Sequence, residues 1–389
     1  MQSLRRHHPC SPAAPPLDDD NLLSEILLRL PPQPSSLPRA SAVCKRWRLL
    51  VSDPGFSRRF RIHHRRNPPL LGIFDERSGE ISFLPTLDAP NRIPPGCLSL
   101  KFDGGDRFLP LGCRHGLVLV FHFNESWKQI LVCDPATADQ HRIALPPGLA
   151  TLMEKTPFNG AVLRAAGETH FRVVLTVADN DNKQHLRALA WVYSSGTGLW
   201  GDVISAPVPP EVPMSEYSTL VFIARQHAVL VGDSLYWRLV GDFYGILEFD
   251  MKKQSLAVIR VPVHILEEGH YIFLIVRAEG GGLGLILWTG CNIQLWKRKN
   301  DCDGAASWVL GRTIELDKLL FLNSEEDDIK ILGFAEENNV LLLWTGGALF
   351  MVHLESLQFK RVFESVHIPH CQPFESVYTA GTPLRIIWD

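Results

Sequence analysis

Hydrophobic residues near the start of the chain recur with the spacing of a short amphipathic helix. The first apolar positions are Leu22, Leu23, Ile26, Leu27 and Leu30. They step by one or three residues, which places them along one face of a helix. The acidic run at 18–20 suits the amino-terminal end of this helix, and "PPQP" at 31–34 ends it because proline cannot continue the hydrogen-bond ladder.

A second apolar series follows and predicts another short helix that begins near Ser35 or Ser36. Its members are Leu37, Ala40, Val43, Cys44, Trp47, Leu50 and Val51. Arginine and lysine fill the gaps between them, as expected for a solvated face. Helices this short expose more apolar surface than they can bury among themselves, so a partner or the rest of the chain must cover part of it.

The pattern changes after residue 67, where runs of β-branched and aromatic residues alternate with Gly, Pro, Asp and Asn turns. A unit of strand, polar turn and strand recurs six times, at 72–85, 131–147, 191–207, 247–262, 294–316 and 350–365. Equivalent positions in these units lie 47 to 60 residues apart. This period is close to that of kelch-like propeller blades and long for WD40 blades.

The repeat predicts an all-β propeller over residues 67–389, most consistent with six blades. Seven blades would need a shorter repeat, and a pair of β-sandwiches is the alternative architecture. Only two strands precede Pro85, so we expect the terminal stretch at 378–389 to supply the missing strands and close the ring.

Composition and cysteine usage narrow the class of protein. Of 389 residues, 46% are hydrophobic and 21% are charged, which is ordinary for a globular protein. No apolar run approaches the length of a membrane span, and residues 1–16 lack the core of a secretory signal, so we expect a disordered segment there. Eight scattered cysteines without a C-x-x-C pair indicate reduced, mostly buried thiols, and hence the cytoplasm and/or nucleus.

Charge is distributed unevenly along the chain. Residues 39–66 carry a net charge of +8 and the first 38 residues carry −1. Because the whole chain has a net charge of −3, residues 67–389 carry −10. The acidic second part slightly favours a basic partner. The basic run "RRFRIHHRR" at 58–66 is expected to be a linker or a solvated helix, with nucleic-acid binding or nuclear import as the less favoured alternatives.

The first helical segment resembles the F-box family. The resemblance lies in "LLSEILLRLP" at 22–31, the "VCKRWR" run at 43–48 and "DPGF" at 53–56, and it predicts an F-box over 17–57. One departure is "LDDDN" at 17–21, where the family usually has Leu-Pro. An F-box implies docking to a Skp-type adaptor and, through it, to a cullin.

The resemblance implies a set of adaptor-binding residues. They are Leu22, Leu23, Ile26, Leu27, Leu30, Pro31, Leu37, Val43, Cys44 and Trp47. An apolar helix face with an aromatic anchor is a common way to dock a partner. The alternative is that these residues only form the core of a small helical domain or pack on the rest of the chain.

The second part resembles the kelch-like, F-box-associated propellers of plant proteins, in "CDPATADQHRIALPP" at 133–147 and "VYSSGTGLW" at 192–200. Together the two resemblances imply the substrate-recognition subunit of an SCF (Skp–cullin–F-box) type E3 ubiquitin ligase, with no catalysis of its own. A propeller-type glycan hydrolase and a non-degradative scaffold stay open. The sequence does not decide whether the propeller binds a peptide, a glycan or a small molecule.

Other motifs give no sign of a cofactor, metal or active site. The histidine pairs at 7–8 and 63–64 lack the spacing of a metal site, and "SEEDDIK" at 324–330 lacks that of an EF-hand loop. The glycine-rich runs at 278–285 and 344–350 lack the lysine of a phosphate loop. The tryptophans of the second part are expected mainly in blade packing.

Overall fold

A computed structural model of the protein describes residues 19–77, 80–94, 96–101, 106–164, 170–180, 186–209, 220–241, 243–262, 265, 273–300, 306–322, 329–364 and 371–379. The expected disordered segment at 1–16 lies outside these residues. The chain divides into two compact units, a helical unit of residues 1–66 with 377–389 and a β unit of residues 67–376. Among the described residues, no helix combines the length and apolar character needed to cross a membrane.

The helical unit contains four short helices: α1 (Asp20–Leu28), α2 (Ser36–Ser41), α3 (Lys45–Ser52) and α4 (Pro54–His63). Side-chain caps fix two of their starts, since Asp19 accepts a hydrogen bond from the Asn21 amide at 2.8 Å and Asp53 accepts one from the Phe56 amide at 2.7 Å. The second predicted helix is in fact two, because the chain leaves the helix at Ala42 and is extended at Cys44.

Helix α4 corrects the predicted linker at 58–66. The helix continues to His63, and Phe60 is 1% exposed in the same core as Leu23, Leu27 and Phe56. The His64 ring nitrogen Nε2 lies 2.8 Å from the Leu28 carbonyl, which ties the end of α4 to the end of α1. Arg58, Arg59 and Arg61 of this run therefore lie on a packed helix, whereas Arg65 and Arg66 follow its end.

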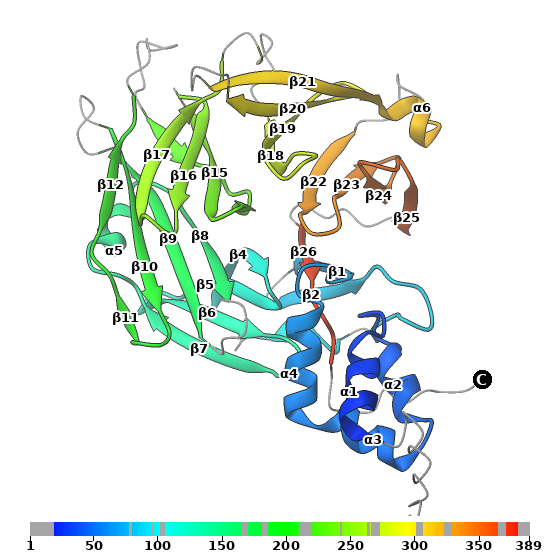
Figure 1. Ribbon diagram of the computed structural model, residues 1–389. Coiled ribbons are helices and arrows are strands. Elements are labelled where there is room, and N and C mark those ends of the chain that lie inside the picture. The colour runs from blue at the N-terminus through cyan, green and yellow to red at the C-terminus, as the bar shows by residue number, and fades with distance from the viewer. Residues whose placement is uncertain are drawn as a thin grey trace, which may run out of the picture. The chain divides into compact units, whose positions relative to one another are not determined.

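The β unit is a ring of six antiparallel sheets, which confirms the six-bladed propeller (Figure 1). From the inner strand outwards, blade 1 consists of β26 (Cys371–Glu375), β1 (Leu70–Arg77), β2 (Glu80–Pro85) and β3 (Leu100–Lys101). Blade 2 consists of β4 (Arg107–Arg114), β5 (Leu117–Phe123), β6 (Lys128–Asp134) and β7 (Asp139–Ala144). Blade 3 consists of β8 (Phe158–Arg164), β9 (Phe171–Asp179), β10 (Arg187–Ser194), β11 (Leu199–Trp200) and β12 (Ile204–Pro207).

The remaining blades have the same order of strands. Blade 4 consists of β13 (Val221–Ile223), β14 (Val229–Val231), β15 (Ser234–Gly241), β16 (Gly245–Asp250) and β17 (Ser255–Arg260). Blade 5 consists of β18 (Phe273–Arg277), β19 (Leu283–Thr289), β20 (Asn292–Asn300) and β21 (Ala306–Glu315). Blade 6 consists of β22 (Lys330–Ala335), β23 (Val340–Thr345), β24 (Ala348–His353) and β25 (Phe359–Glu364). Two short helices, α5 (Leu149–Leu152) and α6 (Leu316–Leu320), lie in connections.

The ring closes differently from the prediction. Strand β26 pairs antiparallel with β1, with Gln372 opposite Phe74, so the last strand of the ring completes the first blade. Of the stretch at 378–389, only residues 378 and 379 are described, and they contain no strand. The closing strand is thus residues 371–375, which lie before the predicted stretch.

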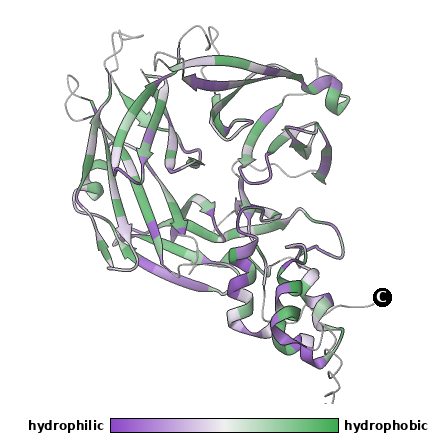
Figure 2. Cartoon of the chain, in the orientation of Figure 1, coloured by the Kyte–Doolittle hydropathy of each residue, from purple (hydrophilic) through white to green (hydrophobic). Residues whose placement is uncertain are grey.

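Hydrophobic clusters fill the space between neighbouring blades. Leu119 and Val132 of blade 2 pack with Val173 and Leu175 of blade 3, and Trp237 is fully buried between blades 3 and 4. The outermost strand β7 buries only Ile143, and Figure 2 shows it as a hydrophilic strand beside hydrophobic inner neighbours. The expected packing role of tryptophan is confirmed for Trp191 and Trp237, which are buried.

Candidate functional site

The predicted adaptor-binding residues fall into two groups in the helical unit. Leu23, Leu27 and Leu37 are buried in its core, while Leu30 and Trp47 are half-buried. The exposed residues are Leu22, Ile26, Pro31, Val43 and Cys44. The first group holds the helices together, so only the second presents its side chains fully to a partner.

The exposed apolar residues belong to neighbouring parts of the helical unit. Leu22 and Ile26 lie one turn apart on α1, with 49% and 44% of their surfaces exposed. Arg46 on α3 pairs with Asp20 on α1 at 2.7 Å, which holds the start of α3, and with it Val43, beside the start of α1. We call the exposed Leu22, Ile26 and Val43 the apolar face. Groups of exposed apolar side chains of this kind mark surfaces that bind partners.

Sequence reasoning missed two exposed apolar residues of this unit, Leu49 of α3 and Ile62 of α4. Leu49 of α3 is 65% exposed and lies between Trp47 and Leu50 of the predicted series. It lies outside the three- and four-residue steps that selected its neighbours. An apolar residue that lies outside the buried stripe of an amphipathic helix is expected to be exposed, and this position in the sequence could have identified Leu49.

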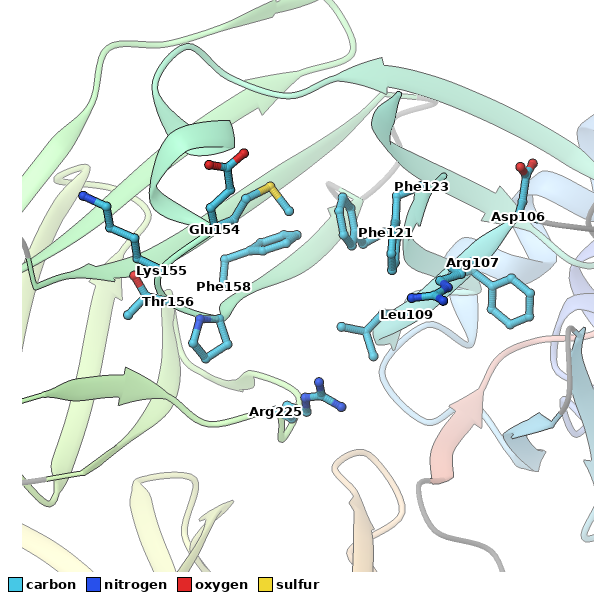
Figure 3. A pocket seen from close by; sticks show the side chains of 13 residues that line it. Asp106, Arg107, Leu109, Phe121, Phe123, Glu154, Lys155, Thr156, Phe158 and Arg225 are labelled. Atoms are coloured by element: carbon cyan, nitrogen blue, oxygen red, sulfur yellow. The ribbon is translucent and has the colours of Figure 1, made fainter. Parts of the chain in front are cut away.

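In the β unit, a cavity of about 690 Å³ opens where the inner strands β4 and β8 begin (Figure 3). Its apolar lining consists of Phe108, Leu109, Phe121, Phe123, Met153, Pro157 and Phe158. The Phe121 ring stacks on Phe123 at a centroid distance of 4.6 Å and meets the Phe158 ring edge-on at 4.9 Å. Blades 2 and 3 thus present an aromatic wall to this cavity.

Five charged residues also line the cavity: Asp106, Arg107, Glu154, Lys155 and Arg225. The two acids have partners, because Asp106 contacts His122 Nε2 at 3.0 Å and the Asn124 amide at 3.1 Å, and Glu154 lies 3.7 Å from Lys128. Arg225 comes from blade 4, in the irregular segment between β13 and β14. Sequence reasoning identified none of these residues, because they come from three blades and form no local motif.

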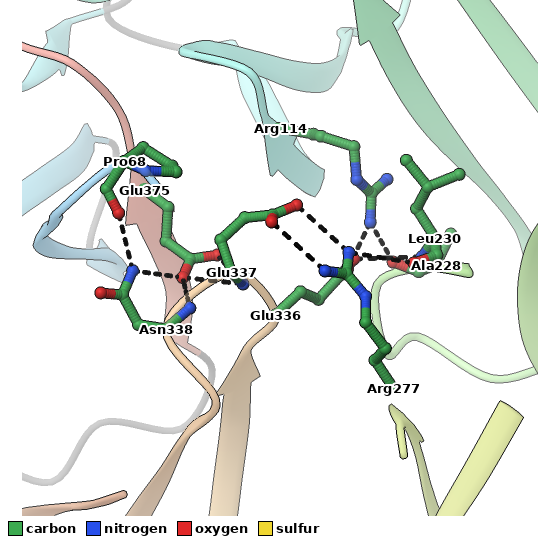
Figure 4. A network of polar contacts seen from close by, with 9 residues as sticks. All are labelled: Pro68, Arg114, Ala228, Leu230, Arg277, Glu336, Glu337, Asn338 and Glu375. Atoms are coloured by element: carbon green, nitrogen blue, oxygen red, sulfur yellow. Dashed lines mark hydrogen bonds and ion pairs between the residues drawn. The ribbon is translucent and has the colours of Figure 1, made fainter. Parts of the chain in front are cut away.

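A polar network joins the opposite ends of the inner strands (Figure 4). Arg114, at the end of β4, pairs with Glu336 of blade 6 and donates to the Ala228 carbonyl of blade 4 at 2.8 Å. The second Glu336 oxygen accepts from the Leu230 amide at 3.1 Å. Arg114 and Glu336 are only 9% and 7% exposed, so this ion pair is largely shielded from water.

The same network includes blades 1 and 5. Arg277, at the end of β18, pairs with Glu337 at 3.2 Å, and Glu375, at the end of β26, accepts hydrogen bonds from the Asn338 amide and side chain at 2.8 and 2.7 Å. Burial raises the pKa of Glu375 to about 7, although these hydrogen bonds oppose the shift. We call these residues, with Arg114 and Glu336, the axial network.

Neither metal sites nor reactive thiols stand out in the part of the chain that the structure describes. No group of three or more His, Cys, Asp or Glu residues there could hold a metal ion. Of the six described cysteines, Cys133 and Cys371 are buried, two are half-buried, and Cys44 and Cys97 are exposed, so fewer are buried than expected. Burial raises the pKa of the Cys133 thiol to about 12, which keeps it protonated.

Known solved structures of similar shape are distant from this chain. A puromycin-hydrolysing peptidase of Mycobacterium tuberculosis is 11% identical, with 67% of this chain and 39% of that chain covered and a TM-score of 0.35. A luciferin-regenerating enzyme is 13% identical, with 80% and 95% covered and a TM-score of 0.34. At these TM-scores the likeness supports no inference about function.

Comparisons of sequence are more informative. Residues 20–63 match the F-box-like family model, a domain class that generally binds Skp-type adaptors, and its match ends where α4 ends. The F-box protein At5g07610 of Arabidopsis thaliana is 28% identical over 331 residues, covering 78% of this chain and 71% of that protein. Residues 111–388 match the model described as F-box protein AT5G49610-like, beta-propeller. An F-box followed by this propeller is the layout of an F-box substrate-adaptor protein, and the chain belongs to the family of F-box proteins with an AT5G49610-like β-propeller.

Proposed function

We propose that this protein is the substrate-recognition subunit of an SCF type E3 ubiquitin ligase. The apolar face would dock a Skp-type adaptor and, through it, a cullin, while the propeller holds a target protein. The observation that carries the proposal is the exposure of Leu22, Ile26 and Val43 beside a core that other residues already fill. Placing these three side chains against a partner would remove them from water, which is the main driving force of association.

In this proposal the protein does no chemistry. Its contribution is proximity, because holding a target lysine near a ubiquitin-carrying enzyme raises the effective concentration of the reactants. The charges in the propeller cavity support this role over that of a glycan hydrolase. Asp106 and Glu154 each contact a basic or amide partner, whereas glycoside hydrolysis needs a general acid and a second carboxylate that face the substrate. The role is compatible with the cytoplasm and/or nucleus.

Co-purification with a Skp-type adaptor tests the docking step. The unchanged chain should retain the adaptor, while Ile26→Asp and Val43→Asp should each weaken binding by about tenfold or more, the equivalent of one buried apolar side chain. Leu199→Asp is the matched control, since Leu199 is 69% exposed on β11 of the propeller. It should bind the adaptor as the unchanged chain does.

A well-folded chain that fails to bind the adaptor would overturn the proposal. A separate measurement tests the ligase role, namely ubiquitin transfer to propeller-bound proteins in a reconstituted ligase with and without this chain. Adaptor binding without any such transfer would favour the non-degradative scaffold instead.

A further inference from the structure

We propose that the propeller cavity binds an acidic peptide segment through an aromatic side chain and neighbouring carboxylates. The inference deepens the proposed function by naming a class of target. Only the consequence of binding, ubiquitination of the bound target, rests on the proposed function. Peptide binding itself does not, because the cavity lies wholly within the β unit and its chemistry does not involve the F-box.

The first support is the aromatic wall. Phe121 contacts both Phe123 and Phe158 at the cavity, with Leu109 on the neighbouring strand (Figure 3). A volume of about 690 Å³ is within the range of sites that enclose a ligand. Aromatic pairs prefer stacked or edge-on contacts, so an incoming aromatic side chain is the natural occupant of this wall.

The second support is the charge that the cavity leaves uncompensated. Its two carboxylates contact His122, Asn124 and Lys128, whereas the exposed guanidinium groups of Arg107 and Arg225 make no hydrogen bond or ion pair within the described part of the chain. Guanidinium groups bind carboxylates through two parallel hydrogen bonds. The local preference is therefore for an anionic partner, although residues 67–389 as a whole carry −10 because the whole chain is −3 and the first 66 residues contribute +7.

The charges that line the cavity should determine which ligand it prefers, because salt screens the more distant charges of the propeller over about 8 Å. A ligand inside the cavity lies next to Arg107 and Arg225, while the two acids that line the cavity already have partners. The overall charge affects the approach of a partner, and the two guanidinium groups determine which segment enters.

The third support is the fixed position of Arg225. The side-chain amide of Asn159, which is 1% exposed, donates to the carbonyls of Ala224 and Gln226 at 2.7 and 2.8 Å. These two residues flank Arg225 in the chain, so the buried amide holds the backbone that carries the guanidinium. A preorganised contact loses less entropy when the ligand binds.

The axial network supports a short segment rather than a threaded chain. The cavity lies where the inner strands begin, and the nearly buried Arg114–Glu336 pair lies where they end. We therefore expect a peptide to enter and leave at the end of the propeller where the cavity lies. The expected contact is one aromatic side chain with acidic residues on one or both sides.

Selection from a displayed library of random twelve-residue peptides tests the proposal on the full chain. We expect the enriched peptides to contain an aromatic residue next to Asp or Glu. A fluorescent copy of the most enriched peptide should bind Arg225→Glu and Arg107→Glu at least about tenfold more weakly, the effect of losing one charge-assisted contact. Arg172→Glu, an exposed arginine of β9 outside the cavity, is the matched control and should bind as the unchanged chain does.

Three results would overturn the proposal: no enriched peptide, enrichment of basic peptides, or binding that the Arg225 and Arg107 variants leave unchanged. The test separates this inference from the proposed function. Peptide binding without adaptor binding would support the peptide site and contradict the ligase role. Adaptor binding without peptide enrichment would support the docking step and contradict the peptide site.

Discussion

Arg114 of blade 2 and Glu336 of blade 6 form an ion pair whose side chains are only 9% and 7% exposed. The two residues are 222 positions apart in the chain, and neither belongs to the blade of the other. Glu336 also accepts from the Leu230 amide, so three blades meet at one carboxylate. The propeller is thus held together at this end by polar contacts as well as by the apolar clusters between its blades.

Arg114→Ala should destabilise the β unit by about 3–5 kcal/mol, because it leaves the Glu336 carboxylate buried without its cation. Arg187→Ala is the control, since Arg187 pairs with Asp179 but is 54% exposed, and it should cost at most about 1 kcal/mol. Urea unfolding followed by tryptophan fluorescence measures both. Equal losses from the two variants would contradict a structural role for the buried pair.

Stability should also depend on pH through Glu375. The folded pKa is raised to about 7 by burial, above the ordinary value of 4.5, so the folded state holds this proton more tightly than the unfolded state. Stability contributed by the protonated group is therefore fully present below about pH 4.5 and is lost as the pH rises to about 7, by about 3 kcal/mol in total.

Glu375→Gln should remove that dependence, since a glutamine oxygen can still accept the hydrogen bonds from Glu337 and Asn338 without becoming charged. Free energies of unfolding measured from pH 4.5 to 8 should show the variant becoming more stable relative to the unchanged protein as the pH rises. Parallel curves would show that Glu375 titrates at its ordinary pKa.

The six-bladed ring was predictable because each blade repeats a strand, a polar turn and a strand at nearly constant spacing. The repeat nevertheless misplaced one strand. The repeat unit at 72–85 contains β1 and β2, the second and third strands of its blade, whereas the unit at 131–147 contains β6 and β7, the third and fourth strands of the next. The error arose because β26, which precedes β1 in space, follows it by about three hundred residues in sequence. Local patterns carry no sign of such a closure.

The apolar face of the helical unit was partly predictable from the sequence, whereas the propeller cavity was not. At about 100° per residue, Leu22 and Ile26 lie on one edge of the apolar stripe of α1, and Leu23 and Leu27 lie on the other. Periodicity identified the stripe, but only packing shows which edge is covered. The cavity was not predictable, since Arg225 lies in an irregular segment and faces residues of two other blades.

Helix α4 provides a test of where the F-box ends. Phe60→Ala should open a cavity in the helical core and cost about 3–5 kcal/mol, which would lower adaptor binding and weaken amide protection in α1. Ile62→Ala, a change at a 41% exposed position of the same helix, should have little effect. Hydrogen exchange on the full chain measures the amide protection in α1. A Phe60 variant with the same protection as the Ile62 variant would restore the linker interpretation.

Asn159 should influence peptide binding without lining the cavity. Asn159→Ala removes the two hydrogen bonds that hold the carbonyls on either side of Arg225, so the guanidinium must be ordered when the peptide binds. We expect the selected peptide to bind about threefold to tenfold more weakly, the cost of ordering one long side chain.

A double-mutant cycle separates this positioning role from a general loss of structure. If Asn159 acts through Arg225, then Asn159→Ala should add little to the loss already caused by Arg225→Gln, because the contact it supports is gone. Fluorescence polarisation with the four proteins measures the coupling. Independent losses that simply add would show that Asn159 supports the blade as a whole and that the position of Arg225 does not depend on it.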